Sequence, residues 1–191
     1  MQRHDAWSPQ SIQDAILLAG GELLMRQPGI VALHSMTTSN AMRYTLATCA
    51  GDHLRRRLIL QNAAFIPLFR DAMGGRGNVE EARIDQLAPA EGDLESVLDH
   101  IGKDRDKAAS TLLGQLDSGT DPRQFTDAAR RLLFIKGNNS HDYKFSSAVL
   151  EDFQHVSPEW RNRFLAASTF QLRGSGSRDN ELVKRARAAL G

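Results

Sequence analysis

The stretch Gly137-Asn138-Asn139-Ser140-His141-Asp142-Tyr143-Lys144-Phe145 places turn residues directly before a histidine, two charged residues and an aromatic residue. Gly137 can end a preceding helix, because glycine adopts the left-handed conformation without Cβ strain. Asn139 or Ser140 can begin the next helix, because a side-chain oxygen of either residue accepts from free first-turn N–H groups. Asp142 then lies in the first turn, where the helix dipole favours negative charge. The stretch therefore predicts a junction between two helices.

The helix that follows this junction carries His141 and Lys144 three positions apart, so the two side chains are neighbours on its surface. His141 borders an apolar stripe, and Lys144 lies further round the helix. The stripe consists of Phe145, Ala148, Val149 and Phe153. Two interpretations remain open: a half-buried histidine beside a solvated lysine, or a pair that takes part in chemistry.

Helical periodicity continues through the rest of the chain, and no alternating strand pattern appears. Ser8-Pro9, Asp121-Pro122 and Ser157-Pro158 are typical helix starts. The sequence predicts an all-α protein with one domain over residues 1–191. A flexible loop is expected near 74–78 and a linker near 174–177. Helices are predicted over 9–27, 30–48, 53–72, 78–88, 91–116, 122–136, 140–156, from 158 onward and over 179–190. Gly102 can divide the predicted helix over 91–116 into two.

The composition limits the classes of protein that the chain can belong to. The 191 residues are 41% hydrophobic and 25% charged, with a net charge of +1, so no strong field for nucleic acid or a membrane is expected. The one cysteine, Cys49, excludes an intrachain disulfide and a multi-cysteine zinc site. No apolar run approaches the roughly 20 residues of a membrane span. The N-terminus lacks the apolar region of a signal peptide. These features predict a cytoplasmic protein.

The predicted helix over 30–48 has an unusual polar face that includes His34, Thr37 and Thr45. If this face is buried, its side chains need partners, because an unpaired buried polar group costs about 1–3 kcal/mol. The face then either lines a polar cavity or satisfies itself, since threonine can bond back to its own helix. In the next helix, Arg55-Arg56-Arg57 forms either a solvated face or a phosphate-binding patch.

Familiar catalytic motifs do not occur. The six histidines form no HExxH, His-x-His or ExxH pair, so a metal site would have to gather them from different helices. There is no Gly-x-Ser-x-Gly nucleophile motif and no glycine-rich fingerprint for NAD or FAD.

Two segments carry a resemblance to a known family. His34-Ser35-Met36-Thr37-Thr38-Ser39-Asn40-Ala41-Met42-Arg43 resembles a helical His-x-x-Thr-x-x-x-Ala-x-Arg pattern of questin oxidase-like proteins. Ser140-His141-Asp142-Tyr143-Lys144-Phe145, with Leu165-Ala166-Ala167 downstream, is similar to that family's later His-x-x-Lys segment and the helix after it. The resemblance covers about residues 15–70 and 130–172, in matching order.

The resemblance implies a mostly helical protein that oxidises aromatic polyketides, including ring-opening of anthraquinones. Some members act without a cofactor or with a nicotinamide, and others hold a non-haem iron with several histidines and a modified lysine. Carried over, it points to His34, Thr37, His141 and Lys144. Family members are longer, and their additional N-terminal histidine segments have no clear counterpart here. Three possibilities remain for the metal site: His53 or His100 completes it, a second chain completes it, or the site has been lost.

Our first prediction is an oxidoreductase or oxygenase acting on an aromatic natural product, with a histidine-bound metal such as non-haem iron. The alternative is a non-catalytic helical binding or assembly protein on the same scaffold. A nucleic-acid or regulatory module is disfavoured by the near-zero net charge. We expect His34 and His141 to face one internal cavity, and apolar faces left uncovered to make the chain self-associate. Four aromatic residues either line a substrate cavity or belong to the core: Phe65, Phe69, Tyr143 and Phe145.

Overall fold

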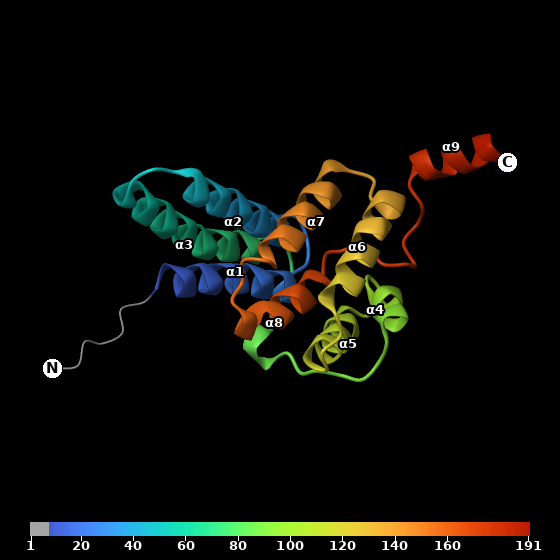
Figure 1. Ribbon diagram of the computed structural model, residues 1–191, viewed down its shortest axis with the longest axis horizontal. Helices are drawn as coiled ribbons and strands as arrows, with labels where there is room; N and C mark the ends of the chain where they lie inside the picture. Colours follow the sequence, from blue (N-terminus) through green and yellow to red (C-terminus); the bar gives the residue numbers. More distant parts are fainter. Residues whose placement is uncertain (1–7) are drawn as a thin grey trace.

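The computed structural model describes residues 8–191, and these residues form nine α-helices and a short 3-10 helix without any strand (Figure 1). This arrangement confirms the all-α class. The elements are α1 (Pro9–Arg26), α2 (Ile30–Thr48), α3 (Asp52–Gly74), η1 (Ile84–Gln86), α4 (Leu94–His100), α5 (Arg105–Asp117), α6 (Pro122–Lys136), α7 (Ser140–Asp152), α8 (Pro158–Ser168) and α9 (Glu181–Leu190).

The helices begin where the capping signals predict them. Ser8 Oγ accepts from the amide of Ser11 at 3.0 Å, and Asp121 Oδ1 accepts from the amide of Arg123 at 2.9 Å. Each cap satisfies an N–H group that has no partner within its own helix, and a proline at the next position needs no such partner. Local chemistry therefore determines these two helix starts.

The start of α8 is held by a distant residue. Asp14 on α1 is buried and accepts two hydrogen bonds from Ser157, from its amide at 3.0 Å and from its Oγ at 2.6 Å. Gln10, one turn earlier on α1, donates to the backbone carbonyl of His155 at 2.9 Å. The first helix is therefore joined directly to the segment that enters α8.

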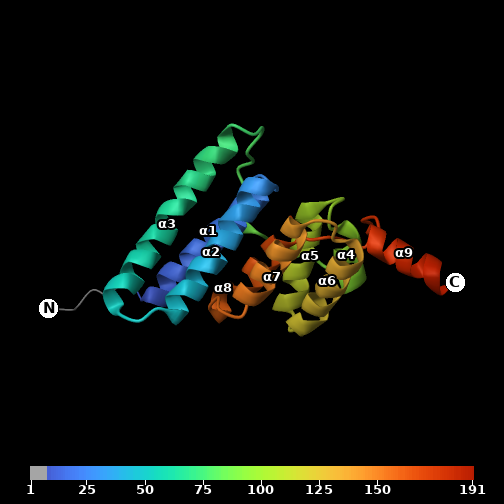
Figure 2. The ribbon, with the colours of Figure 1, turned by 90° about the horizontal axis from the view of Figure 1, so that it is seen from above.

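Figure 2 shows how the elements are distributed along the molecule. The helices α1, α2 and α3 lie at one end, α4, α5 and α6 lie toward the other, and α7 and α8 lie between them. The helix α9 projects from the end opposite α3. One continuous core joins the two ends. Its most deeply buried side chains include Leu24, Met36, Leu112, Leu113, Phe125, Phe145, Phe164 and Leu165.

Two predicted helices differ from the structure. The prediction for 78–88 is wrong, because this segment has no regular secondary structure apart from the single turn η1. Its backbone bonds to α1 instead of to itself: Glu80 N donates to Arg26 O, and Arg26 Nε donates to Ala82 O, each at 2.9 Å. The predicted helix over 91–116 is divided into α4 and α5, and Gly102 makes the turn between them at a φ of +86°.

The apolar side chains of α3 form a stripe that is only partly covered. Leu54 and Leu68 expose 48% and 60% of their surface, and only Asn62 and Met73 are buried in this helix. The cause is position, because α3 lies at one end of the molecule and packs mainly against α1 and α2. At the other end, the segment near 174–177 packs against α4. The amide of Ser175 donates there to Leu98 O at 2.9 Å.

Candidate functional site

The junction before α7 is built largely as expected. Asn139 is the residue that caps the helix, since its Oδ1 accepts from the amides of His141 at 2.9 Å and Asp142 at 3.2 Å. Ser140 is the first residue of α7. Gly137 ends α6 with a φ of −67°, so its expected left-handed conformation is wrong. A Cβ at Gly137 would lie 2.6 Å from Leu133 O, which shows that close approach requires the glycine.

His34 on α2 and His141 on α7 lie side by side. Their ring centroids are 5.5 Å apart and the ring planes meet at 83°. The packing of α2 and α7 thus brings the two imidazoles together. The expected internal location is wrong, because the surface of His34 is exposed and that of His141 is half-buried.

Lys144 and Thr37 lie on the same two helices as the histidine pair, Lys144 on α7 and Thr37 on α2. Lys144 is exposed, and among residues 8–191 it forms no ion pair. Thr37 donates from Oγ1 to the carbonyl of His34 at 3.4 Å, and Thr45 bonds back to Ala41 at 2.9 Å. These two threonines therefore bond to their own helix, as one of the two interpretations required.

The other two predicted metal ligands lie on different elements. His53 is exposed in the first turn of α3. His100 is the last residue of α4, where its Nδ1 hydrogen-bonds with Ser96 O at 2.6 Å. Within the described part of the chain, no group of three or more His, Cys, Asp or Glu side chains could hold a metal ion. The histidine pair therefore has no third ligand of these types from residues 8–191.

The four aromatic side chains are dispersed. Phe145 is 1% exposed and belongs to the core. Phe65 and Phe69 lie 6.2 Å apart on α3, and both are half-buried. Tyr143 lies 6.4 Å from Phe134, at a groove between α6 and α7. The four residues therefore do not line one substrate cavity.

An ion pair between α2 and α7 was not foreseen from the sequence. Asp152 is fully buried, and its Oδ1 accepts from Arg43 Nε at 2.6 Å and from Asn40 Nδ2 at 2.9 Å. Its Oδ2 is also buried and finds no hydrogen-bond partner in the part of the chain that the structure describes. Burial raises the pKa of the Asp152 carboxyl, although the bonds from Asn40 and Arg43 oppose the rise.

The ion pair also sets the alignment of the two helices. His34 contacts His141 near the start of α2 and α7, and Arg43 binds Asp152 farther along both. The two helices therefore run parallel to each other. Because two separated contacts join them, neither helix can slide along the other without breaking the ion pair. Arg43 and Asp152 thereby hold the two imidazoles in place.

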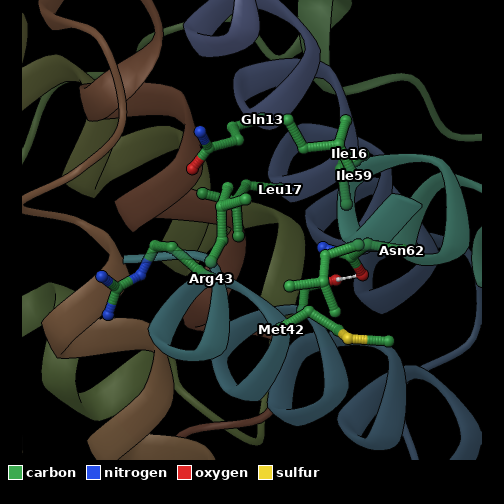
Figure 3. A pocket seen from close by; sticks show the side chains of 10 residues that line it. Gln13, Ile16, Leu17, Met42, Arg43, Ile59 and Asn62 are labelled. Atoms are coloured by element: carbon green, nitrogen blue, oxygen red, sulfur yellow. Dashed lines mark hydrogen bonds between the residues drawn. The ribbon is translucent and has the colours of Figure 1, made fainter. Parts of the chain in front are cut away.

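Arg43 also borders two clefts between the first three helices. Figure 3 shows the narrower one, where Leu17 of α1, Met42 of α2 and Ile59 of α3 converge. A hydrogen bond of 3.2 Å from Ser39 to Asn62 crosses it. The wider cleft has a volume of about 540 Å³. Its polar lining consists of Gln10, Gln13, Arg43, Asp52, Arg55, Arg56 and His155.

The wider cleft gathers three arginines, of which Arg43 is paired with Asp152 and Arg55 with Asp52. Arg55 lies 3.9 Å from Asp52 and also donates to the carbonyl of Cys49. Arg56 is exposed and makes no ion pair with any residue from 8 to 191. Sequence spacing placed Arg55 and Arg56 on one helix, but the contribution of Arg43 from α2 follows only from the packing of the helices.

No family model, no curated protein and no solved structure matches this chain. Over residues 8–191, no helix is long and apolar enough to cross a membrane.

Proposed function

We propose that this chain is an oxidoreductase that binds a divalent transition metal through His34 and His141. The observation that carries the proposal is the 5.5 Å separation of the two rings. Neutral imidazole nitrogens bind iron, zinc and copper, at about 2.0–2.1 Å for zinc, and rings this close can share one ion. The exposure of His34 leaves coordination positions open to solvent, oxygen and a substrate.

Lys144 supplies a third ligand in this proposal. It lies one helical turn after His141, and its exposure makes the amine accessible. The neutral amine nitrogen bonds to the carbon of CO₂ and loses a proton. The product is a carbamate whose oxygen can bind a metal, whereas a protonated lysine cannot. The resemblance to questin oxidase-like proteins supports an aromatic polyketide as the substrate class.

The proposal is tested by metal content and oxygen consumption. We expect the purified parent to bind one Fe²⁺ or Zn²⁺ per chain and to consume oxygen with an anthraquinone probe. His34→Ala, His141→Ala and Lys144→Arg should each lose metal and activity while circular dichroism shows an unchanged helical fold. His53→Ala is the matched control, because His53 is an exposed histidine outside the pair. Equal metal binding by His34→Ala, His141→Ala and the parent would contradict the proposal.

The alternative of a non-catalytic binding protein is favoured by the wider cleft. Arg43, Arg55 and Arg56 approach it from two helices, and Gln10 and Gln13 add amide donors. Arginine forks and amides are donors suited to phosphate and carboxylate groups. This second candidate function is the binding of a small anion.

The anion-binding function is tested by calorimetry with inorganic pyrophosphate. Binding should weaken strongly in Arg56→Glu and remain unchanged in Arg57→Glu, because Arg57 is exposed on the same helix but does not line the cleft. Binding that is equally weakened by both variants would indicate a nonspecific charge effect and would reject the cleft as the site.

A further inference from the structure

The C-terminal helix α9 is amphipathic but leaves its apolar side uncovered. Leu182 and Leu190 expose 71% and 89% of their surface, and no residue of α9 is buried. Its apolar residues follow the helical period at positions 182, 183, 186, 189 and 190. Isolated helices shorter than about 12–15 residues are marginal in water. A helix of 10 residues therefore needs a packing partner.

The start of α9 is anchored firmly to α6. Asn180 is buried, donates to the carbonyls of Phe134 at 2.8 Å and Gly137 at 2.9 Å, and accepts from the amide of Val183 at 2.9 Å. Lys136 pairs with Asp179 at 2.7 Å. From this anchor the helix projects away from the rest of the molecule (Figures 1 and 2). The anchor therefore fixes the direction of α9 but, beyond half-burying Val183, leaves its apolar side exposed.

A groove between α6 and α7 offers a matching surface. Its volume is about 560 Å³, and its walls include Leu133, Phe134, Tyr143 and Leu150. Phe134 is 67% exposed and Tyr143 is 39% exposed. Exposed aromatic residues beside a groove are typical anchors of protein interfaces.

We propose that the apolar side of α9 docks into the α6–α7 groove of a second copy of this chain, and that the exchange is reciprocal. Both halves of the interface are present on one chain, as a two-fold symmetric dimer requires. Phe134 belongs to both features, because its side chain lines the groove and its carbonyl binds Asn180 at the base of α9. A two-fold axis near this point brings each α9 to the groove of its partner.

The charges beside the groove and the area of the interface agree with docking of α9 from a second copy. Glu151 lines the groove, where its Oε1 binds Arg43 of the same chain while 49% of the side chain stays exposed, and Arg185 on α9 makes no ion pair with any residue of the described chain. Arg185 can therefore pair with Glu151 of the other copy. A stable interface buries about 800 Å² on each partner. One short helix in one groove buries less area than this. In a reciprocal dimer each partner buries both its own α9 and its own groove, so the two areas add.

The dimer is tested by light scattering on the full chain over a wide concentration range. We expect the mass of a dimer for the parent. Leu182→Asp on α9 and Phe134→Asp in the groove should each weaken dimerisation roughly tenfold or more. Leu60→Asp on α3 should leave it unchanged, and this control is well matched because Leu60 is 69% exposed and Leu182 is 71% exposed. A monomeric parent, or dissociation by Leu60→Asp alone, would overturn the proposal.

Disulfide trapping identifies the occupant of the groove. In a Cys49→Ser background, a chain carrying Leu182→Cys is mixed with a chain carrying Phe134→Cys and oxidised. A mixed dimer supports docking between copies. If a chain with both cysteines closes on itself at monomer mass instead, α9 docks into its own groove and the proposal is overturned.

Discussion

Arg43 Nε donates a hydrogen bond of 2.6 Å to Oδ1 of Asp152, and this bond joins the middle of α2 to the last residue of α7. Asp152 is fully buried and the side chain of Arg43 is 10% exposed. Two charges so far removed from water stabilise one another only while both are present. The pair therefore stabilises the contact between α2 and α7, which also brings His34 to His141.

Removing one member of this pair should destabilise the fold strongly. Arg43→Met leaves the Asp152 carboxylate buried without its cation, and such a change typically costs about 3–5 kcal/mol. The double variant Arg43→Met with Asp152→Asn should recover part of the loss, because the buried group is then neutral. Urea unfolding measures both free energies. Equal stability of the single and double variants would show that the charge of Asp152 does not matter.

The stability of the parent should also depend on the titration of Asp152. Burial raises its folded-state pKa above the value of 3.8 expected for a free side chain. The folded protein therefore binds more protons than the unfolded chain above that value, and the contribution of Asp152 to stability falls as pH rises through the folded-state pKa. Relative to Asp152→Asn, the parent should gain stability from neutral toward mildly acidic pH. Urea unfolding at several pH values measures this difference, and a constant difference would contradict the assignment.

Gly114 should not tolerate a side chain. A Cβ at this position of α5 would clash with the backbone carbonyl of Ala90, in a loop whose Ala90 amide donates to the Ser110 carbonyl. Alanine normally stabilises a helix relative to glycine by about 0.5–1 kcal/mol. Here we expect Gly114→Ala to lower the melting temperature. Gly74→Ala at the end of α3 is the control, because nothing lies within 4 Å of its Cβ position. Equal melting temperatures for the two variants would disprove the close approach.

Asn180 should be the residue that keeps α9 attached and helical. Asn180→Ala removes the cap on Val183 and the two bonds to α6, and loss of such a cap typically costs about 1 kcal/mol. Amide hydrogen exchange over residues 181–190 should become faster in this variant. Exchange in α8 of the same sample serves as the control and should not change. Unaltered protection of α9 would show that its packing partner, and not Asn180, holds it in place.

Local sequence signals predicted most helix starts because capping depends on nearby atoms. Ser8 and Asp121 act within three residues of themselves, so their pattern is visible in the sequence. The segment 78–88 was mispredicted because its backbone partners, such as Arg26, lie on α1 and are invisible to periodicity. The exposure of α3 was missed for a related reason, since a stripe does not reveal whether the molecule supplies enough surface to cover it.

The candidate site was predictable only in part. The polar face of α2 and the place of His141 beside an apolar stripe led to the prediction that these two histidines face one internal cavity, and the two rings do lie together, although at the surface. Their position at the surface depends on how deeply α2 and α7 are packed, which the polar pattern of α2 did not reveal. Arg43 and Asp152 were missed because an ion pair between distant helices leaves no spacing signal in the chain.

The two hydrogen bonds from Ser157 to Asp14 can form only late in the synthesis of the protein on the ribosome. The helices α1, α2 and α3 are complete once residue 74 has been synthesised, but α7 and α8, which pack against α2 and α1, come much later. At about 5–20 residues per second, the segment up to Ser157 takes on the order of ten seconds to emerge. Throughout that interval the carboxylate of Asp14 has no Ser157 to bind. The sides of α1 and α2 that α8 and α7 cover in the finished fold stay open to solvent and chaperones until those helices arrive.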